Sequence, residues 1–264
     1  MCTEKKPTRR TLLRTAVAAG VLATPQVVHA ADAPKVNARE LSPKEALAYL
    51  YKGNTRFLEG KPLAPHRDED RERELATAQA PFAAFPGCAD SRVPIEMVFD
   101  QGFGDLFVTR IAGNVSTPEC LGSLEFGTLA LGAKVFYVLG HSSCGAVDAA
   151  IKGDEVPGQI SVLFQHLRPT VRAAKGDLDA AIRDNVRLQA KLIAESSPVV
   201  ARLVRQEKLI VAGGVYNLAT GKVEPVEIKK KSQMPRAMSN FRCDFASRYD
   251  RHFMHQSQSL AHLA

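Results

Sequence analysis

Two short polar clusters, each directly after an apolar run, contain the residue types that bind metal ions. The first is CADSR at 88–92 and the second is HSSC at 141–144. Two thiolates and one imidazole suit tetrahedral zinc, and H-x-x-C spacing lets a ring nitrogen and a sulfur converge on one ion. The sequence therefore predicts that Cys88, His141 and Cys144 bind Zn²⁺.

The number of ligands separates a catalytic zinc site from a structural one. Structural sites are closed by four protein ligands, whereas catalytic sites keep one position open for water. The candidate for a fourth ligand is Asp90, and Arg92 lies two residues further along the chain. A guanidinium can hold a carboxylate through two hydrogen bonds and turn it away from a metal. The pattern therefore favours an open, catalytic site.

Three other interpretations of these residues stay open. The metal can have a purely structural role in a non-catalytic zinc protein, and such a site would need a fourth protein ligand. The two cysteines can act as a redox pair, although the chain has no C-x-x-C motif. They can also be buried core thiols, with His141 at the start of a helix.

Apolar runs alternate with helical patterns along the chain. Four runs predict buried strands, at 81–85, 106–111, 134–139 and 208–216. Helices are expected from residue 42, and at 68–78, 116–131, 159–174, 178–194 and 197–205. This alternation predicts an α/β fold with a mostly parallel central sheet of about four to five strands flanked by helices. Chemistry in such sheets gathers beyond the carboxyl ends of the strands, where both polar clusters stand.

The two clusters resemble the zinc motif of the β-class carbonic anhydrases, C-x-D-x-R followed by H-x-x-C. Three further stretches are similar to that family: GFGDLFV at 102–108, AGN at 112–114 and GGVYNL at 213–218. The resemblance covers roughly residues 41–226. It implies the fold of that family and the reversible hydration of carbon dioxide to bicarbonate and a proton, by attack of a zinc-bound hydroxide.

The resemblance also implies a role for each matching residue. One zinc per subunit would be held by Cys88, His141 and Cys144, with Asp90 and Arg92 as the catalytic dyad. The expected substrate-binding residues are Gln79 as a hydrogen-bond donor, Phe107 and Ala112 in an apolar pocket, Phe126 in place of a common tyrosine, and Gly145 beside the metal. The family is built on dimers, so a homodimer or higher even oligomer with the site at the subunit boundary is expected.

Some members of this family have a closed state, in which the counterpart of Asp90 takes the fourth zinc position and bicarbonate binds an inhibitory pocket. That pocket uses a tryptophan three residues before the first ligand cysteine, where this chain has Phe85 and contains no tryptophan at all. The open state is therefore expected. Two points stay open: whether the same scaffold hydrolyses carbon disulfide or carbonyl sulfide instead, and whether His66 or no group relays the proton.

The first 30 residues have the pattern of an export signal. TRRTLLR at 8–14 is a twin-arginine motif, an apolar run follows at 16–23, and small residues around Ala30 offer a cleavage site. A basic amphipathic helix is the alternative. The expected organisation of this periplasmic or secreted protein is an export signal at 1–30, a linker at 31–40, a catalytic domain at 41–226 and a basic tail at 227–264.

The net charge of +7 is concentrated at the two ends of the chain. Residues 1–30 carry +4 and residues 229–264 carry +5, which leaves −2 for the segment between them. The folded domain is therefore expected to offer no surface for nucleic acid. No apolar run reaches the roughly 18 residues of a membrane span, so no stable membrane anchor is expected. Cys120 is expected to be a small apolar helix residue, and Cys243 to pair between chains or stay free.

Overall fold

A mostly parallel sheet forms the centre of the computed structural model, which describes residues 40–153 and 155–228. The strands lie in the order β2-β1-β3-β4-β5. The parallel strands are β1 (Ala83–Gly87), β2 (Leu106–Arg110), β3 (Val135–His141) and β4 (Ile210–Tyr216), and β5 (Val223–Pro225) is antiparallel to β4. The predicted α/β fold with four to five mostly parallel strands is confirmed.

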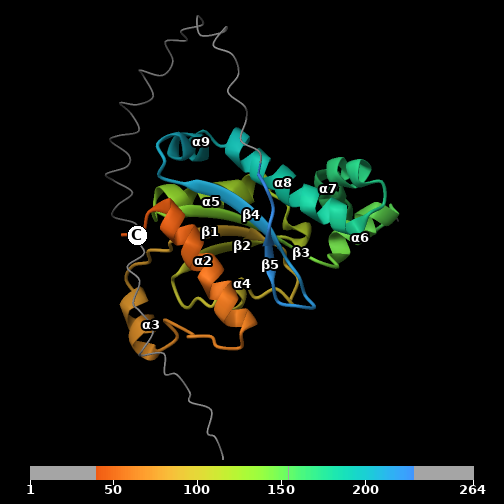
Figure 1. Ribbon diagram of the computed structural model, residues 1–264. Coiled ribbons are helices and arrows are strands. Elements are labelled where there is room, and N and C mark those ends of the chain that lie inside the picture. Colours follow the sequence, from red (N-terminus) through yellow and green to blue (C-terminus); the bar gives the residue numbers. More distant parts are fainter. Residues whose placement is uncertain (1–39, 154, 229–264) are drawn as a thin grey trace, which may run out of the picture.

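Helices cover both faces of this sheet (Figure 1). Helices α2 and α4 contribute to the core on one face, and α5 to α9 contribute to the core on the other. The helices are α2 (Pro43–Leu58), α3 (Glu69–Leu75), α4 (Ile95–Val98), the 3₁₀ helix η2 (Ala112–Asn114), α5 (Pro118–Leu129), α6 (Gly145–Lys152), α7 (Ile160–Ala174), α8 (Leu178–Ser196) and α9 (Pro198–Arg205). Helix α3 ends three residues before the predicted end at 78, because the chain leaves the helix at the C-cap, Ala76, and forms a turn at 76–77.

Successive residues of the central strands point to opposite faces of the sheet. In β3, Phe136 and Val138 belong to the core beside α5 to α9, whereas Val135, Tyr137 and Leu139 belong to the core beside α2 and α4. Every residue of this strand is buried. A strand covered on both faces therefore explains the uninterrupted apolar run in the sequence.

Strand β1 contains Pro86, although proline has no backbone donor for a central strand. Its pairing with β2 runs without a gap. Its pairing with β3 joins Ala83, Ala84 and Gly87 to their partners and skips Phe85 and Pro86. The strand thus continues past the proline and leads directly into the first polar cluster.

Four predicted features lie outside the described residues: the export signal at 1–30, nearly all of the linker at 31–40, the tail from residue 229 onward, and Cys243. Within 40–153 and 155–228, none of the helices has the length and apolar character needed to cross a membrane. A short connection with a turn at 218–220 joins β4 to β5. Strand β5 itself was not predicted, since three residues are too few to display a periodic pattern.

Replacing glycine by alanine is expected to have opposite effects on stability at two positions in helices. A Cβ on Gly53 of α2 would lie 1.8 Å from the carbonyl oxygen of Phe99, whereas a Cβ on Gly122 of α5 would meet nothing within 4 Å. We expect Gly53→Ala to lower the free energy of unfolding by about 1–3 kcal/mol through overpacking. Gly122→Ala is expected to raise it by up to about 1 kcal/mol through helix propensity. Chemical denaturation measures both values, and effects of equal sign would contradict this packing.

Candidate metal centre

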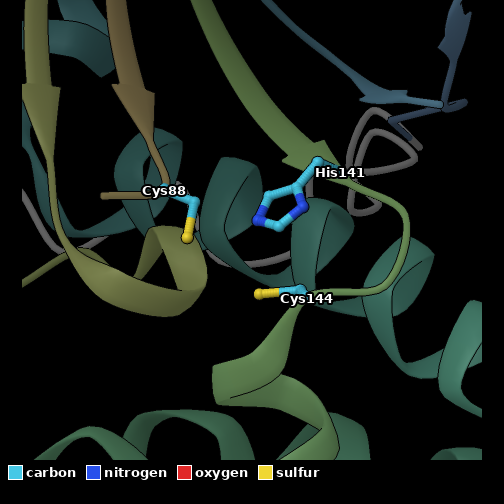
Figure 2. Close-up of side chains that lie close together, drawn as sticks. All are labelled: Cys88, His141 and Cys144. Atoms are coloured by element: carbon cyan, nitrogen blue, oxygen red, sulfur yellow. The ribbon is translucent and has the colours of Figure 1, made fainter. Parts of the chain in front are cut away.

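The carboxyl ends of β1 and β3 bring the two polar clusters together. Cys88 follows β1, His141 is the last residue of β3, and Cys144 is the N-cap of α6. Because these strands are parallel neighbours, their ends meet at the same edge of the sheet. The candidate ligand atoms, two sulfurs and a ring nitrogen, all lie within 4.8 Å of one another. Figure 2 shows the three side chains pointing toward a common space.

The hydrogen bonds of His141 leave one ring nitrogen free for a metal. Its Nδ1 lies 2.9 Å from the carbonyl oxygen of Ser142, which can only accept, so Nδ1 carries the hydrogen. The other nitrogen, Nε2, is buried and has no hydrogen-bond partner. A buried polar atom without a partner is costly. A metal ion bound between Nε2 and the two sulfurs removes that cost, so the donor set fits zinc.

The two thiols differ in acidity because they lie side by side in a buried site. The hydrogen bond from Cys144 lowers the pKa of the Cys88 thiol. The same contact, together with burial, raises the pKa of Cys144. One thiolate therefore forms readily, while its negative charge opposes formation of the second. A divalent cation between the sulfurs offsets this repulsion and allows both to bind as thiolates.

Asp90 is held by Arg92 beside the three candidate ligands. The guanidinium donates from Nε to Oδ1 at 2.9 Å and from Nη2 to Oδ2 at 2.7 Å, and the backbone nitrogen of Arg92 also donates to Oδ1. Arg92 Nη2 reaches the carbonyl oxygen of Ser143 as well, at 3.2 Å. These hydrogen bonds hold the pKa of the Asp90 carboxyl well below its usual range. The carboxylate is thus ionised and directed toward Arg92, as the open arrangement requires.

Two further residues contact this site and were not foreseen from the sequence. Arg110, the last residue of β2, donates from Nε to the carbonyl oxygen of Cys88 at 2.9 Å and also bonds the carbonyl oxygen of Asp90. The backbone nitrogen of Gly113 donates to Cys88 Sγ at 3.3 Å. A signal for Arg110 was present, since it ends a strand at the same edge of the sheet. The Gly113 donor is a backbone N–H, which cannot be recognised from the residue type.

Of the predicted substrate-binding residues, Ala112 and Gly145 lie beside the metal ligands within one chain, whereas Gln79, Phe107 and Phe126 lie farther away. Ala112 begins η2 next to Gly113, and Gly145 begins α6 next to Cys144. Phe107 and Phe126 form a ring pair with centroids 6.4 Å apart. Phe107 pairs with Ala84, three residues before the end of β1. Its backbone therefore lies roughly 10 Å from the carboxyl end of that strand, where the metal ligands are located. Gln79 is exposed between α3 and β1.

His66 lies at the opposite end of the sheet from the metal centre. Its Nδ1 is 2.7 Å from Oδ1 of Asp105, which immediately precedes β2. The metal ligands follow the carboxyl ends of β1 and β3, whereas Asp105 stands at the amino ends of these parallel strands. His66 therefore does not relay a proton from the metal centre of its own chain.

Comparison with known proteins gives a family for this arrangement. A family model described as carbonic anhydrase matches residues 83–223, more than half of the chain and both polar clusters. The chain belongs to the carbonic anhydrase family. Carbonic anhydrase 2 of Mycobacterium tuberculosis is 34% identical over 189 residues, which cover 69% of this chain and 91% of that protein. The predicted enzyme class, carbonic anhydrase, is confirmed.

Solved structures place this carbonic anhydrase in the β class. The β-carbonic anhydrase of Coccomyxa, solved in complex with acetazolamide, matches with a TM-score of 0.51 and 26% identity over 68% of this chain and 86% of that chain. A tetrameric β-carbonic anhydrase of Sordaria macrospora shares the fold, with a TM-score of 0.56 and 21% identity over 70% of this chain and 98% of that chain. The resemblance to the β class is confirmed.

Proposed function

We propose that this carbonic anhydrase reversibly hydrates carbon dioxide to bicarbonate and a proton with one Zn²⁺ per chain, held by Cys88, His141 and Cys144. The observation that carries the proposal is the buried Nε2 of His141, which has no hydrogen-bond partner and lies within 4.8 Å of two buried sulfurs. When bound, zinc supplies hydroxide near neutral pH, because it lowers the pKa of water from about 16 toward 7.

In this proposal, Asp90 orients the attacking oxygen. Its Oδ2 lies 3.7 Å from His141 Nε2, the nitrogen proposed to bind zinc. Arg92 fixes the carboxylate through two hydrogen bonds and keeps it negatively charged. An ionised, fixed carboxylate can accept the hydrogen of the attacking oxygen and direct the lone pair of that oxygen toward the carbon of carbon dioxide. Arg92 acts through Asp90, as a positioning residue.

We further propose that a homodimer or higher even oligomer completes the site, with Gln79, Phe107, Ala112, Phe126 and Gly145 around the substrate. Phe126 is 42% exposed in a single chain, and carbon dioxide, which is apolar, favours a dry niche. Strand β2 is an edge strand, and exposed Met97 and Phe103 line a hollow beside it. The tetrameric assembly of the Sordaria proteins supports an even oligomer. A monomer in solution, by mass measurement, would rule this out.

Stopped-flow measurement of carbon dioxide hydration by the zinc-loaded protein tests the proposed function. We expect fast turnover that chelation abolishes, and a rate that rises between neutral and mildly alkaline pH. The rise is expected because the limiting acid belongs to the zinc site, whereas Asp90 is already ionised at neutral pH. A flat profile would count against zinc-supplied hydroxide. Bound zinc without hydration would favour a structural metal, and hydrogen sulfide release from carbonyl sulfide or carbon disulfide would instead favour those substrates.

We propose that the protein acts in a periplasmic or secreted compartment after twin-arginine export. The support is the TRRTLLR motif at 8–14 with the apolar run that follows it. That export route carries folded proteins, which suits an enzyme that must bind its metal before it leaves the cytoplasm. N-terminal sequencing of the exported protein tests this, and a mature chain that still begins at Met1 would refute it.

A further inference from the structure

We propose that Asn185 and Gln189, two buried amides on α8, are positioning residues of the metal centre. They hold the backbone at 112–116 so that the Gly113 N–H donates to the sulfur of Cys88. The inference rests on the proposed function only in taking Cys88 as a metal ligand. According to this proposal, α8 helps to position Cys88 at the end of β1, although the two amides lie more than forty residues beyond His141 in the sequence.

The Gly113 donor requires a support because its backbone is conformationally free. The N–H lies 3.3 Å from Cys88 Sγ. Gly113 has a φ of +75° and is followed by Asn114 with a φ of +44°, so both residues are in the left-handed region. Glycine enters that region without strain but also leaves it easily. The direction of this N–H is therefore set by the contacts that hold the neighbouring peptide groups.

Asn185 provides that support directly. Its Nδ2 donates to the carbonyl oxygen of Gly113 at 2.7 Å and to Oδ1 of Asn114 at 3.3 Å. The side chain of Asn185 is fully buried. One amide group thus fixes the two consecutive left-handed residues that determine where the Gly113 N–H points.

Gln189, one helical turn further along α8, holds Asn185 and the end of the same segment. Its Nε2 donates to Oδ1 of Asn185 at 3.1 Å, and its Oε1 accepts from the backbone nitrogen of Ser116 at 2.9 Å. Gln189 is also fully buried. The two amides therefore form one chain of hydrogen bonds, which fixes the segment at both of its ends.

The surroundings of these amides argue against a role in helix packing alone. The other buried residues of α8 are apolar: Ala181, Ile182, Val186, Ala190 and Ile193. Burying an amide in such a face costs free energy unless it is hydrogen-bonded. The hydrogen bonds of Asn185 and Gln189 go to each other and to the 112–116 segment. Apolar residues at these two positions would serve the helix as well, so the amides act on the segment.

The hydrogen bond to Cys88 has a chemical consequence for the metal centre. A donor aimed at a thiolate fixes the sulfur and withdraws part of its negative charge, which alters the electron density that the ligand gives to a metal. Removing a partner of this kind typically weakens metal affinity by about 10–100-fold. Loss of the hydrogen bonds of Asn185 and Gln189 is expected to weaken metal affinity by an amount in this range, because it releases the Gly113 N–H from its position.

Cobalt substitution of the Asn185→Leu variant tests the inference, because absorption by thiolate-to-cobalt charge transfer reports on the sulfur itself. Leucine nearly matches asparagine in size and forms no hydrogen bond. We expect a shifted charge-transfer band and cobalt and zinc affinities weaker by about 10–100-fold. A folded variant with the wild-type band and wild-type affinities would overturn the inference.

Asn54→Leu is the matched control. Asn54 is also a buried asparagine with three hydrogen bonds, but its partners are the backbones of Val98, Gly221 and Val223, on the other face of the sheet. We expect it to lose stability as Asn185→Leu does, while keeping the wild-type band and affinities. Equal spectral shifts in both variants would reduce Asn185 to a general stabilising role and overturn the inference.

Gln189→Met keeps the inference testable if Asn185→Leu does not fold. Methionine has nearly the length of glutamine, so the variant removes only the outer two hydrogen bonds of the chain. A shift of the band in the same direction is expected, and an unchanged band and affinity would overturn the inference. Absence of any thiolate–cobalt band in the wild-type protein would refute the proposed metal centre itself, which is a different result from equal bands in wild type and variant.

Discussion

The Cys144→Ser variant is expected to lose bound zinc and carbon dioxide hydration together. Cys144 supplies one of the two sulfurs that lie within 4.8 Å of the other candidate ligand atoms. A serine hydroxyl is far less acidic than a thiol and binds zinc poorly, so the variant keeps two good ligands instead of three. Since outer-shell changes alone cost about 10–100-fold, we expect this ligand change to lower metal affinity and activity by more than about 100-fold. Elemental analysis and stopped-flow hydration measure the two losses.

Cys120→Ser is the control for this variant. Cys120 is also a buried thiol, on α5, but its Sγ lies 3.2 Å from Oγ1 of Thr109 and does not belong to the metal group. Burial raises the pKa of Cys120, which marks it as an ordinary core thiol. We expect Cys120→Ser to keep its zinc and its rate, because serine can maintain the hydrogen bond to Thr109. Full zinc content and activity in Cys144→Ser would refute the assignment of that ligand.

The fold could be predicted where a segment is long enough to display a pattern. The apolar run at 134–139 became β3 because both of its faces are covered by helices. The helix expected from residue 42 begins there with a capping box of Ser42 and Glu45, in which Ser42 N donates to Glu45 Oε2 at 2.8 Å. Helix α4 has four residues and was not predicted, because it is, like β5, too short to display a periodic pattern. Short elements are determined by tertiary contacts, which leave no period in the sequence.

The candidate site divides in a similar way. Its metal ligands could be predicted because strand ends in a parallel sheet converge, so residues more than fifty positions apart become neighbours. The support from α8 could not be predicted, because Asn185 binds backbone atoms of Gly113, and backbone atoms carry no sequence signature. One signal was nevertheless available: Asn185 and Gln189 interrupt the apolar face of α8 at a spacing of four residues. A buried polar pair on a helix indicates a partner elsewhere in the fold.

The Asp90→Asn variant is expected to keep its zinc and to lose most of its rate. The substitution preserves the size of the side chain but removes the charge that binds Arg92. An amide would also point an N–H toward one of the guanidinium donors, so one of the two hydrogen bonds is lost. Loss of a positioned proton acceptor typically costs about 10²–10⁴-fold. We expect a fall of that size in kcat/KM for carbon dioxide hydration, with one zinc per chain retained.

The pH dependence of this variant separates orientation by Asp90 from titration of Asp90. Arg92 depresses the pKa of the folded-state carboxyl, so the stabilisation from this pair is present above the unfolded-state value of about 4 and is lost only as the pH falls below it. Asp90 therefore does not change its charge between neutral and mildly alkaline pH. The variant should be slower at every pH in that range while its activity still rises with pH.

Asp148→Asn is the control for Asp90→Asn, because Asp148 is a half-exposed carboxylate on α6 with its own cationic partner, Lys152, at 2.7 Å. Removing this surface charge should leave the rate and its pH profile unchanged, since exposed ion pairs contribute little. Wild-type turnover in Asp90→Asn would remove the carboxylate from the mechanism. A lower rate accompanied by loss of zinc would instead assign Asp90 to metal binding, and with it the closed arrangement of the site.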